Sequence, residues 1–243
     1  MLVKPPIGLS IIESCATCKL REERLFCNLK GVALQQLERI KFSTSYSANS
    51  TLFSEGQPSS GVMILCQGRV KLSMSGTGGN TAILKIVEPG EVLGLSSTVS
   101  GILHDTTAEA LDPVQVNIIR RDDFLKFLAD YPDACMHAVQ ELSNTHNTAC
   151  HEIRTLTLSQ SVAERFAKLL LEWDAKTPES SKGRITVGFT HEEVAQLLGT
   201  AREVVSRLIG DFKNKRVIQV KGATWVVTNR SALQKIAGIQ PTH

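Results

Sequence analysis

Residues 190–207 read THEEVAQLLGTAREVVSR, and this stretch decides the fold of the C-terminal part of the chain. Its two threonines, Thr190 and Thr200, are each followed three residues later by a glutamate, which is the spacing of a capping box at a helix start. Gly199 separates the two segments and suits the left-handed turn that ends a helix. Two short helices joined by a tight glycine turn predict a helix-turn-helix, whose second helix reads DNA.

The second of these helices has two distinct faces. Apolar side chains recur at helical spacing and predict a buried face, formed by Val205, Leu208, Ile209 and Phe212. A second face gathers polar side chains in the first two turns: Arg202, Glu203, Ser206 and Arg207. Arginine can bond guanine twice, glutamate can accept from cytosine, and serine suits a base or a phosphate. The alternative is a solvated face with one Glu–Arg ion pair at i,i+4.

A basic segment and two alternating runs follow this helix. The runs at 217–220 and 224–228, around a turn at 221–223, predict a β-hairpin wing. Residues 159–243 hold 13 Lys and Arg against 8 Asp and Glu, a net charge of +5, whereas the rest of the chain carries −2. Positive charge on this end suits phosphate contacts. The predicted DNA contacts are Thr190, Thr200, Arg202, Glu203, Ser206, Arg207 and Lys213.

Length and composition set broad limits. The chain has 243 residues, enough for two modest domains, and its hydrophobic content of 42% is ordinary for a globular protein. No apolar run approaches the roughly 20 residues that a membrane span needs. We see no secretion signal at the N-terminus, so the six cysteines indicate a reducing cytoplasm and serve as thiols, ligands or redox sensors rather than as structural disulfides.

The middle of the chain has the sequence pattern of an all-β domain. Short apolar runs at 51–53, 62–65, 69–74, 83–87 and 114–119 alternate with glycine-containing turns. Short strands at this spacing predict a small barrel or jelly roll.

Helical periodicity returns after Asp122. From Cys135 onward, small and apolar residues recur at alternating steps of four and three, which is a heptad seam. The seam positions are Cys135, Val139, Leu142, His146, Ala149, Ile153 and Leu156. We expect this helix to pair with a second copy, so that two recognition helices read half-sites about one DNA turn apart. The alternative is a long helix packed on its own barrel.

The order of these parts resembles the CRP/FNR family of bacterial transcription regulators, and more closely its FNR branch. The resemblance rests on GVMILCQGRVKL (61–72), VEPGEVLGL (87–95) and GTAREVVSR (199–207). It implies an α+β fold in four parts: a cysteine-containing arm (1–29), a cyclic-nucleotide-binding-like β-roll or double-stranded β-helix (30–130), a dimerisation helix (131–158) and a winged helix-turn-helix (159–243).

The same resemblance implies partners. Glu203, Ser206 and Arg207 match the reading pattern of the FNR branch, which implies a homodimer on palindromic double-stranded DNA with TTGAT-like half-sites. Arg202 is what the cyclic AMP receptor branch carries there, so TGTGA-like half-sites stay open. RNA polymerase is a further expected partner, through surface loops at 53–57 and 92–98.

Cyclic AMP does not fit the β-roll sequence. Members that bind cyclic nucleotides use G-E-x-x-G-E and then an arginine some ten residues on, which pairs with the phosphate. Here the second glutamate is replaced by Leu95, and Asp105 stands near the place of the arginine. A buried phosphate without a cationic partner is costly, which argues against cyclic AMP.

The arm holds Cys15, Cys18 and Cys27. It resembles the cysteine cluster of the FNR branch, which implies a [4Fe–4S] cluster held by these three thiolates and a fourth ligand from the β-roll. The gap before Cys27 is longer than in the family, and the strand that usually supplies the fourth ligand has no cysteine. Cys66 is the candidate if it faces the arm, and Asp112 is the alternative. A zinc site, a thiol switch with pKa values lowered by nearby arginines, and an inert arm also remain open.

Other classes of function are less well supported. A metal-dependent enzyme of the cupin type needs clustered histidines, and His104 is the only histidine in the barrel segment. His146 and His151 are five residues apart rather than the four of a helical metal pair. We therefore expect no enzyme. A protein-binding adaptor with a degenerate helix-turn-helix is a further alternative, as is a regulator that senses another small ligand.

Overall fold

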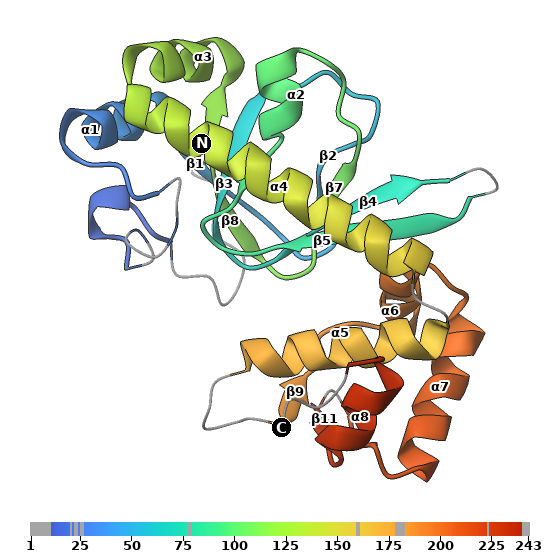
Figure 1. The fold of residues 1–243 in the computed structure, drawn as a ribbon. Helices are drawn as coiled ribbons and strands as arrows, with labels where there is room; N and C mark the ends of the chain where they lie inside the picture. The colour runs from blue at the N-terminus through green and yellow to red at the C-terminus, as the bar shows by residue number, and fades with distance from the viewer. Residues whose placement is uncertain are drawn as a thin grey trace. The chain divides into compact units, whose positions relative to one another are not determined.

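The computed structural model describes residues 11–19, 21, 24, 27–76, 79–158, 161–177, 183–222 and 224–239. The chain forms two compact units, Met1–Ala149 and Cys150–His243 (Figure 1). The boundary lies inside the longest helix, α4 (Pro132–Leu158), so this helix begins in the first unit and ends in the second.

Two four-stranded antiparallel sheets form the β-roll of the first unit. One has the order β1 (Lys41–Tyr46), β8 (Val114–Arg120), β3 (Gly61–Gln67) and β6 (Val92–Leu93). The other has the order β2 (Thr51–Phe53), β7 (Thr107–Ala110), β4 (Val70–Ser75) and β5 (Thr81–Val87). Leu65, Val70 and Val114 are fully buried in the core that the strands share. The β-roll prediction is confirmed; β1, β6 and β7 were not predicted, because they are short or carry polar side chains.

Four helices complete this unit: α1 (Gly31–Ile40), α2 (Leu95–Ser100), α3 (Arg121–Asp130) and the first part of α4, with a 3-10 turn at Cys15–Thr17. The apolar faces of these helices pack with Val62 of β3 in a second core, which also contains Leu37 and Phe124. The expectation of a surface loop at 92–98 is wrong, since this segment forms β6 and the start of α2 and buries Leu95. Residues 55–57 of the other expected loop are exposed in a turn.

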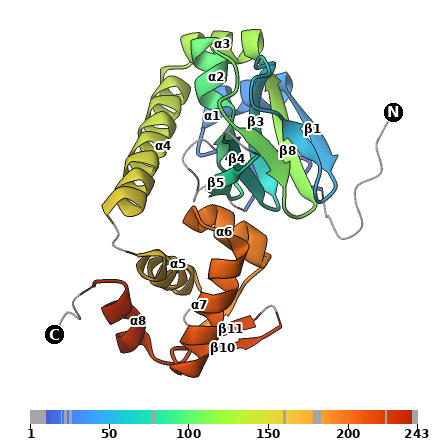
Figure 2. The same cartoon turned by 90° about the vertical axis from the view of Figure 1, so that its right-hand side faces the viewer.

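Helix α4 runs along one side of the β-roll (Figure 2). Ala134 and Ala138 are buried against the roll, at 0% and 3% exposure. Val139 and Ile153, both on the predicted heptad seam, are 54% and 62% exposed. The side chain of Leu156 lies outside the described residues. The first turns of α4 therefore pack on their own barrel while most of the seam faces outward. No helix among the described residues has the length and apolar character to span a membrane.

The second unit holds α5 (Val162–Lys176), β9 (Arg184–Thr186), α6 (His191–Leu198), α7 (Arg202–Asn214), β10 (Ile218–Lys221), β11 (Thr224–Val227) and α8 (Arg230–Ile236). Its sheet has the order β10-β11-β9, so the predicted hairpin gains a third strand, β9, that the sequence analysis missed. Phe166, Phe212 and Trp225 pack together in the core of this unit. Residue 223, in the hairpin turn, lies outside the described residues.

Candidate DNA-reading face and cysteine pocket

The first helix of the helix-turn-helix begins as the sequence predicts. Thr190 caps α6: its hydroxyl accepts from the Glu193 N–H at 3.2 Å, and the Glu193 carboxylate accepts from the Thr190 N–H at 2.8 Å. Gly199 ends the helix in the left-handed conformation, with φ 59°. Arg165 of α5 then donates to the carbonyl of Leu198 at 3.1 Å, so a side chain of the neighbouring helix satisfies the end of α6.

The second capping box is absent, contrary to the prediction. The N-cap of α7 is Ala201, whose side chain has no hydrogen-bonding group, and helical bonding begins at the Ala201 carbonyl. The N–H of Thr200 donates to the carbonyl of Ala195 at 3.0 Å and closes the turn after α6. Because the turn is so tight, Thr200 hydrogen-bonds to the end of α6 and does not cap α7.

Helix α7 has the two faces that the sequence predicts. Val205, Ile209 and Phe212 are buried and Leu208 is partly buried. The side chains of the other face are exposed to solvent: Arg202, Glu203, Ser206, Arg207 and, near the helix end, Lys213.

Ser206 has a neighbour that the sequence analysis missed. The Nδ1 atom of His191, the first residue of α6, lies 3.1 Å from the Ser206 hydroxyl oxygen. The start of α6 and the second turn of α7 come together only because the chain turns at Gly199. No local pattern in the sequence therefore indicates the His191–Ser206 pair.

Four cysteines line one pocket in the first unit. Cys15, Cys18 and Cys27 come from the arm, and Cys66 comes from β3. Cys66 therefore faces the arm, as the role of fourth ligand requires. Asp112 does not line this pocket. Its two carboxylate oxygens accept hydrogen bonds from Arg69 at 2.7 and 3.0 Å. In the described part of the chain, no group of three or more His, Cys, Asp or Glu side chains is arranged to hold a metal ion.

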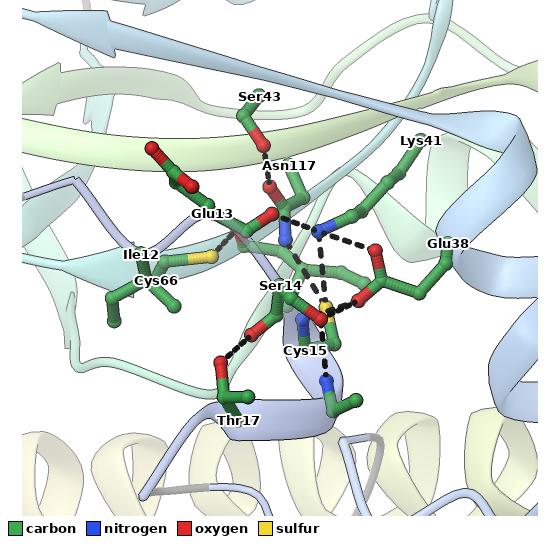
Figure 3. Close-up of polar contacts among 12 residues, drawn as sticks. Ile12, Glu13, Ser14, Cys15, Thr17, Glu38, Lys41, Ser43, Cys66 and Asn117 are labelled. Atoms are coloured by element: carbon green, nitrogen blue, oxygen red, sulfur yellow. Dashed lines mark hydrogen bonds and ion pairs between the residues drawn. The ribbon is translucent and has the colours of Figure 1, made fainter.

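A polar frame surrounds Cys15 (Figure 3). Lys41 Nζ lies 3.4 Å from its sulfur and 3.3 Å from the Glu38 carboxylate, and Asn117 Nδ2 donates to the sulfur at 3.5 Å. Glu38 accepts from the Cys15 N–H. Burial would lower the pKa of Lys41, but Cys15 and Glu38 raise it above its ordinary value. These contacts hold the Cys15 thiol beside a lysine that stays charged.

Strand β8 holds the arm at a second point. The buried amide of Gln115 accepts from the Ile12 N–H at 2.8 Å and donates to the Ile12 carbonyl at 2.7 Å. Gln115 and Asn117 both lie on β8 and contact the arm, at Ile12 and at Cys15. The sequence analysis noted this strand only for its lack of a cysteine.

Two of the pocket thiols, Cys27 and Cys66, have raised pKa values. Burial raises the pKa of Cys27 to about 12, and the neighbouring cysteines Cys15 and Cys18 add to the effect. Burial also raises the pKa of Cys66 to about 12. The expectation that the arm arginines lower a thiol pKa is wrong for Cys27, where the charge of Arg24 is outweighed by burial.

The arm also contacts the 89–91 turn and the core beneath α4. The side-chain stem of Arg24 lies against Gly90, where a Cβ atom would come within 2.2 Å of Cγ. Cys27 packs against the core cluster that includes Ala134 and Ala138 of α4.

The turn that would hold a cyclic nucleotide is engaged in internal contacts. Glu91 accepts from Lys85 Nζ at 2.6 Å and from the Glu88 N–H at 2.7 Å. Leu95 is buried, while Asp105 is exposed beside His104, which stacks on a phenylalanine ring.

The two cysteines of α4 are exposed rather than buried. They are Cys135, which lies on the outward seam, and Cys150.

The chain is similar to known regulators along most of its length. A cyclic nucleotide-binding domain model matches residues 43–131, and a Crp-like helix-turn-helix domain model matches residues 164–236. A CRP-like cAMP-activated global transcriptional regulator of Mycobacterium tuberculosis is 26% identical over 215 residues, which cover 88% of this chain and 96% of the relative. The nitrogen fixation regulation protein FixK of Bradyrhizobium diazoefficiens is 23% identical over 208 residues, 85% of this chain and 86% of the relative.

A solved structure agrees with this assignment at the level of the fold. FixK2 from Bradyrhizobium japonicum superposes with a TM-score of 0.72 at 21% identity, covering 84% of this chain and 100% of that one. The sensor-type β-roll and the Crp-like helix-turn-helix occur here in the family's order. The chain belongs to the CRP/FNR family of DNA-binding transcription regulators.

Proposed function

We propose that this regulator is a homodimer whose DNA binding responds to oxygen or redox state through the cysteine pocket. The observation that carries the proposal is the convergence of three arm thiols with Cys66 on one pocket. Four cysteine thiolates are the usual ligand set of an iron–sulfur cluster.

The pocket also offers a positive charge. Arg21 lines it, and the buried Nε atom of Arg21 has no hydrogen-bond partner within the described residues. Four thiolates in one pocket carry a large negative charge, which such a donor offsets. A [4Fe–4S] cluster supplies a redox-active centre when it is bound. Cys15, Cys18, Cys27 and Cys66 would hold it, while Lys41 and Asn117 orient Cys15.

The contact of Cys27 with the core beneath α4 supports a path from the pocket to the dimer helix. If Cys27 binds a metal centre as a thiolate, we expect the core cluster against which it packs, which includes Ala134 and Ala138, to repack. The signal then acts as a population shift between states of weak and strong DNA binding.

The decisive experiment is purification without oxygen, followed by iron, sulfide and zinc analysis and a visible spectrum. We expect brown protein with iron and sulfide that bleaches in air. Cys66→Ser should lose most of the iron, whereas the matched control Cys150→Ser, at an exposed position off the seam, should keep it. Zinc without sulfide would support the zinc site instead, and colourless metal-free protein would favour thiol oxidation or another small ligand.

The dimer rests on the exposed seam of α4. Val139 and Ile153 leave apolar surface on one helix face, and burial of such side chains contributes about 1.5–3 kcal/mol each. We expect Val139→Glu to weaken self-association in sedimentation equilibrium. The control Asn144→Glu adds the same charge at an exposed position off the seam and should leave the dimer intact. Equal effects of the two substitutions would contradict the proposal that the seam is the dimer interface.

A dimer predicts a palindromic target, and the resemblance to the FNR branch implies TTGAT-like half-sites. Selection from random duplex DNA tests both expectations. An enriched palindrome supports the proposal, and an enriched TGTGA-like half-site would assign the main reading role to Arg202. No enriched sequence would favour the adaptor.

We further propose that cyclic AMP is not the effector. Glu91 is already engaged by Lys85 and the Glu88 N–H, and Leu95 and Asp105 offer no partner to a phosphate. Calorimetric titration with cyclic AMP should give no binding heat, with the cAMP-activated mycobacterial relative as the positive control. Saturable binding would overturn this part of the proposal.

A further inference from the structure

The pair formed by His191 and Ser206 links the start of α6 to the DNA-reading face of α7. The distance from Nδ1 to the hydroxyl oxygen is 3.1 Å, which is a hydrogen bond in either direction. His191 directly follows the capping Thr190, so the Thr190–Glu193 capping box fixes its backbone. The Gly199 turn fixes the other helix relative to it. Ser206 is exposed, and its hydroxyl keeps further bonding capacity toward a ligand.

The proton on Nδ1 decides what Ser206 can offer to a base. A hydroxyl has one proton to donate and two lone pairs to accept with. When Nδ1 carries a proton, it donates to Ser206, and the serine proton stays available for the DNA. When Nδ1 carries a lone pair, Ser206 donates to it and faces the DNA as an acceptor only.

We propose that His191 is a specificity-determining residue, which sets whether Ser206 donates to or accepts from the base pair that it contacts. This inference rests on the proposed base-reading role of Ser206. As a donor, Ser206 suits the acceptors of thymine O4 or guanine O6 and N7; as an acceptor, it suits the amino groups of adenine or cytosine. The imidazolium form always carries a proton on Nδ1, so acid favours the donor state.

Histidine side chains in general change charge between about pH 5 and 8, so pH is the variable that tests the proposal. The charged side chains on the same or adjoining elements are Glu192 and Glu193 on α6, Arg202, Glu203 and Arg207 on α7, and Arg165 on α5. Glu193 is turned to Thr190, and Arg165 is bound to the carbonyl at the other end of α6.

The experiment measures dissociation constants of the full-length dimer for palindromic duplexes that differ in one base pair per half-site. Measurements are made at about pH 6 and about pH 8, at one salt concentration. Ser206→Ala first identifies the position that Ser206 reads. At that position we expect wild-type protein to change its relative affinity for a keto base over an amino base by about five- to tenfold between the two pH values.

Three variants separate the outcomes. His191→Phe keeps a ring without nitrogen, so it should bind DNA with the pH dependence of base preference removed. His191→Asn provides a second, polar replacement if the phenylalanine variant does not fold. Glu192→Gln changes a neighbouring charge on α6 but keeps His191, and should retain the switch.

The results that would overturn the inference are distinct from those that would overturn the reading role. If acid strengthens binding to all duplexes equally, His191 is a phosphate contact only. If both His191 variants keep the wild-type pH response, the ring does not control Ser206. If Ser206→Ala changes discrimination at no position, the proposed reading role of Ser206 fails, and the inference fails with it.

Discussion

The DNA-reading face and the cysteine pocket assemble their functional side chains in opposite ways. The face comes from a single helix, α7, in which Arg202, Ser206 and Arg207 are exposed neighbours within two turns. The pocket draws on the arm, β3, β8 and the turn around Gly90. Its contacts join residues as far apart in the sequence as Ile12 and Gln115. One region depends on one helix, and the other depends on the whole β-roll.

The two regions also differ in what surrounds their polar groups. The charged side chains of α7 stay in water, where they remain ready to meet phosphates and base edges. In the pocket, burial raises the pKa of Cys27 and Cys66, so these two thiols hold their protons tightly. The face is ready to bind as it stands, whereas the pocket thiols must lose protons before they can act as ligands.

The largest expected effect concerns thiol reactivity in metal-free protein. With a pKa of about 12 in place of 9.0, Cys27 and Cys66 have about a thousandfold fewer thiolates near neutral pH. We expect iodoacetamide to modify Cys150, which is exposed on α4 and off the seam, far faster than either of them. Raising the pH should keep increasing the rate at Cys66 beyond pH 9, where an ordinary thiol levels off.

Peptide mass spectrometry after timed quenching gives the rates of all three cysteines in one sample. Equal rates at Cys66 and Cys150 would mean that the pocket is open in solution, and the contrast between a buried and an exposed region would fail.

The next effect tests whether the face reads bases. Arg207→Ala should cost about 1–3 kcal/mol per half-site and relax one base position. Lys213 near the end of α7 is an expected phosphate contact, so Lys213→Ala should weaken binding to all sequences equally and reduce the salt slope by about one. Competition binding with matched and mismatched duplexes separates the two. An equal loss on both duplexes for Arg207→Ala would reduce it to a phosphate contact.

The contact between Gly90 and Arg24 of the arm predicts a smaller effect, which a matched pair of glycine substitutions tests. Gly90 and Gly56 have φ values of 94° and 80°, and alanine at either site costs about 1–3 kcal/mol of backbone strain. A Cβ at Gly90 also meets the stem of Arg24, whereas at Gly56 it meets nothing within 4 Å. Gly90→Ala should therefore displace the arm and raise alkylation of Cys27, and Gly56→Ala should not. If both variants alkylate like wild type, Arg24 does not anchor the arm.

The same contrast explains what the sequence could predict. The α7 face follows from spacing alone, because a helix brings residues three and four apart together. Cys66 was different: the register of β3 against β8 shifts between Leu65 and Gln67, so alternation does not say which way Cys66 points. Lys41 and Gln115 could not be placed at all, because only the packing of distant strands brings them to the arm.

The threonines of the opening motif mark the limit of local patterns even within the helix-turn-helix. Thr190 and Thr200 have the same Thr-x-x-Glu spacing, yet only Thr190 caps a helix. Thr190→Ala should lower the free energy of unfolding by about 1 kcal/mol. Thr200→Ala should change it by no more than about 0.5 kcal/mol, as is usual for surface positions without such a role.

Urea denaturation of the two variants measures this difference directly. Because Thr200 uses its backbone N–H to close the turn after α6, a side-chain substitution leaves that bond in place. A loss at Thr200 equal to that at Thr190 would mean that the helix start at Ala201 shifts back by one residue in solution.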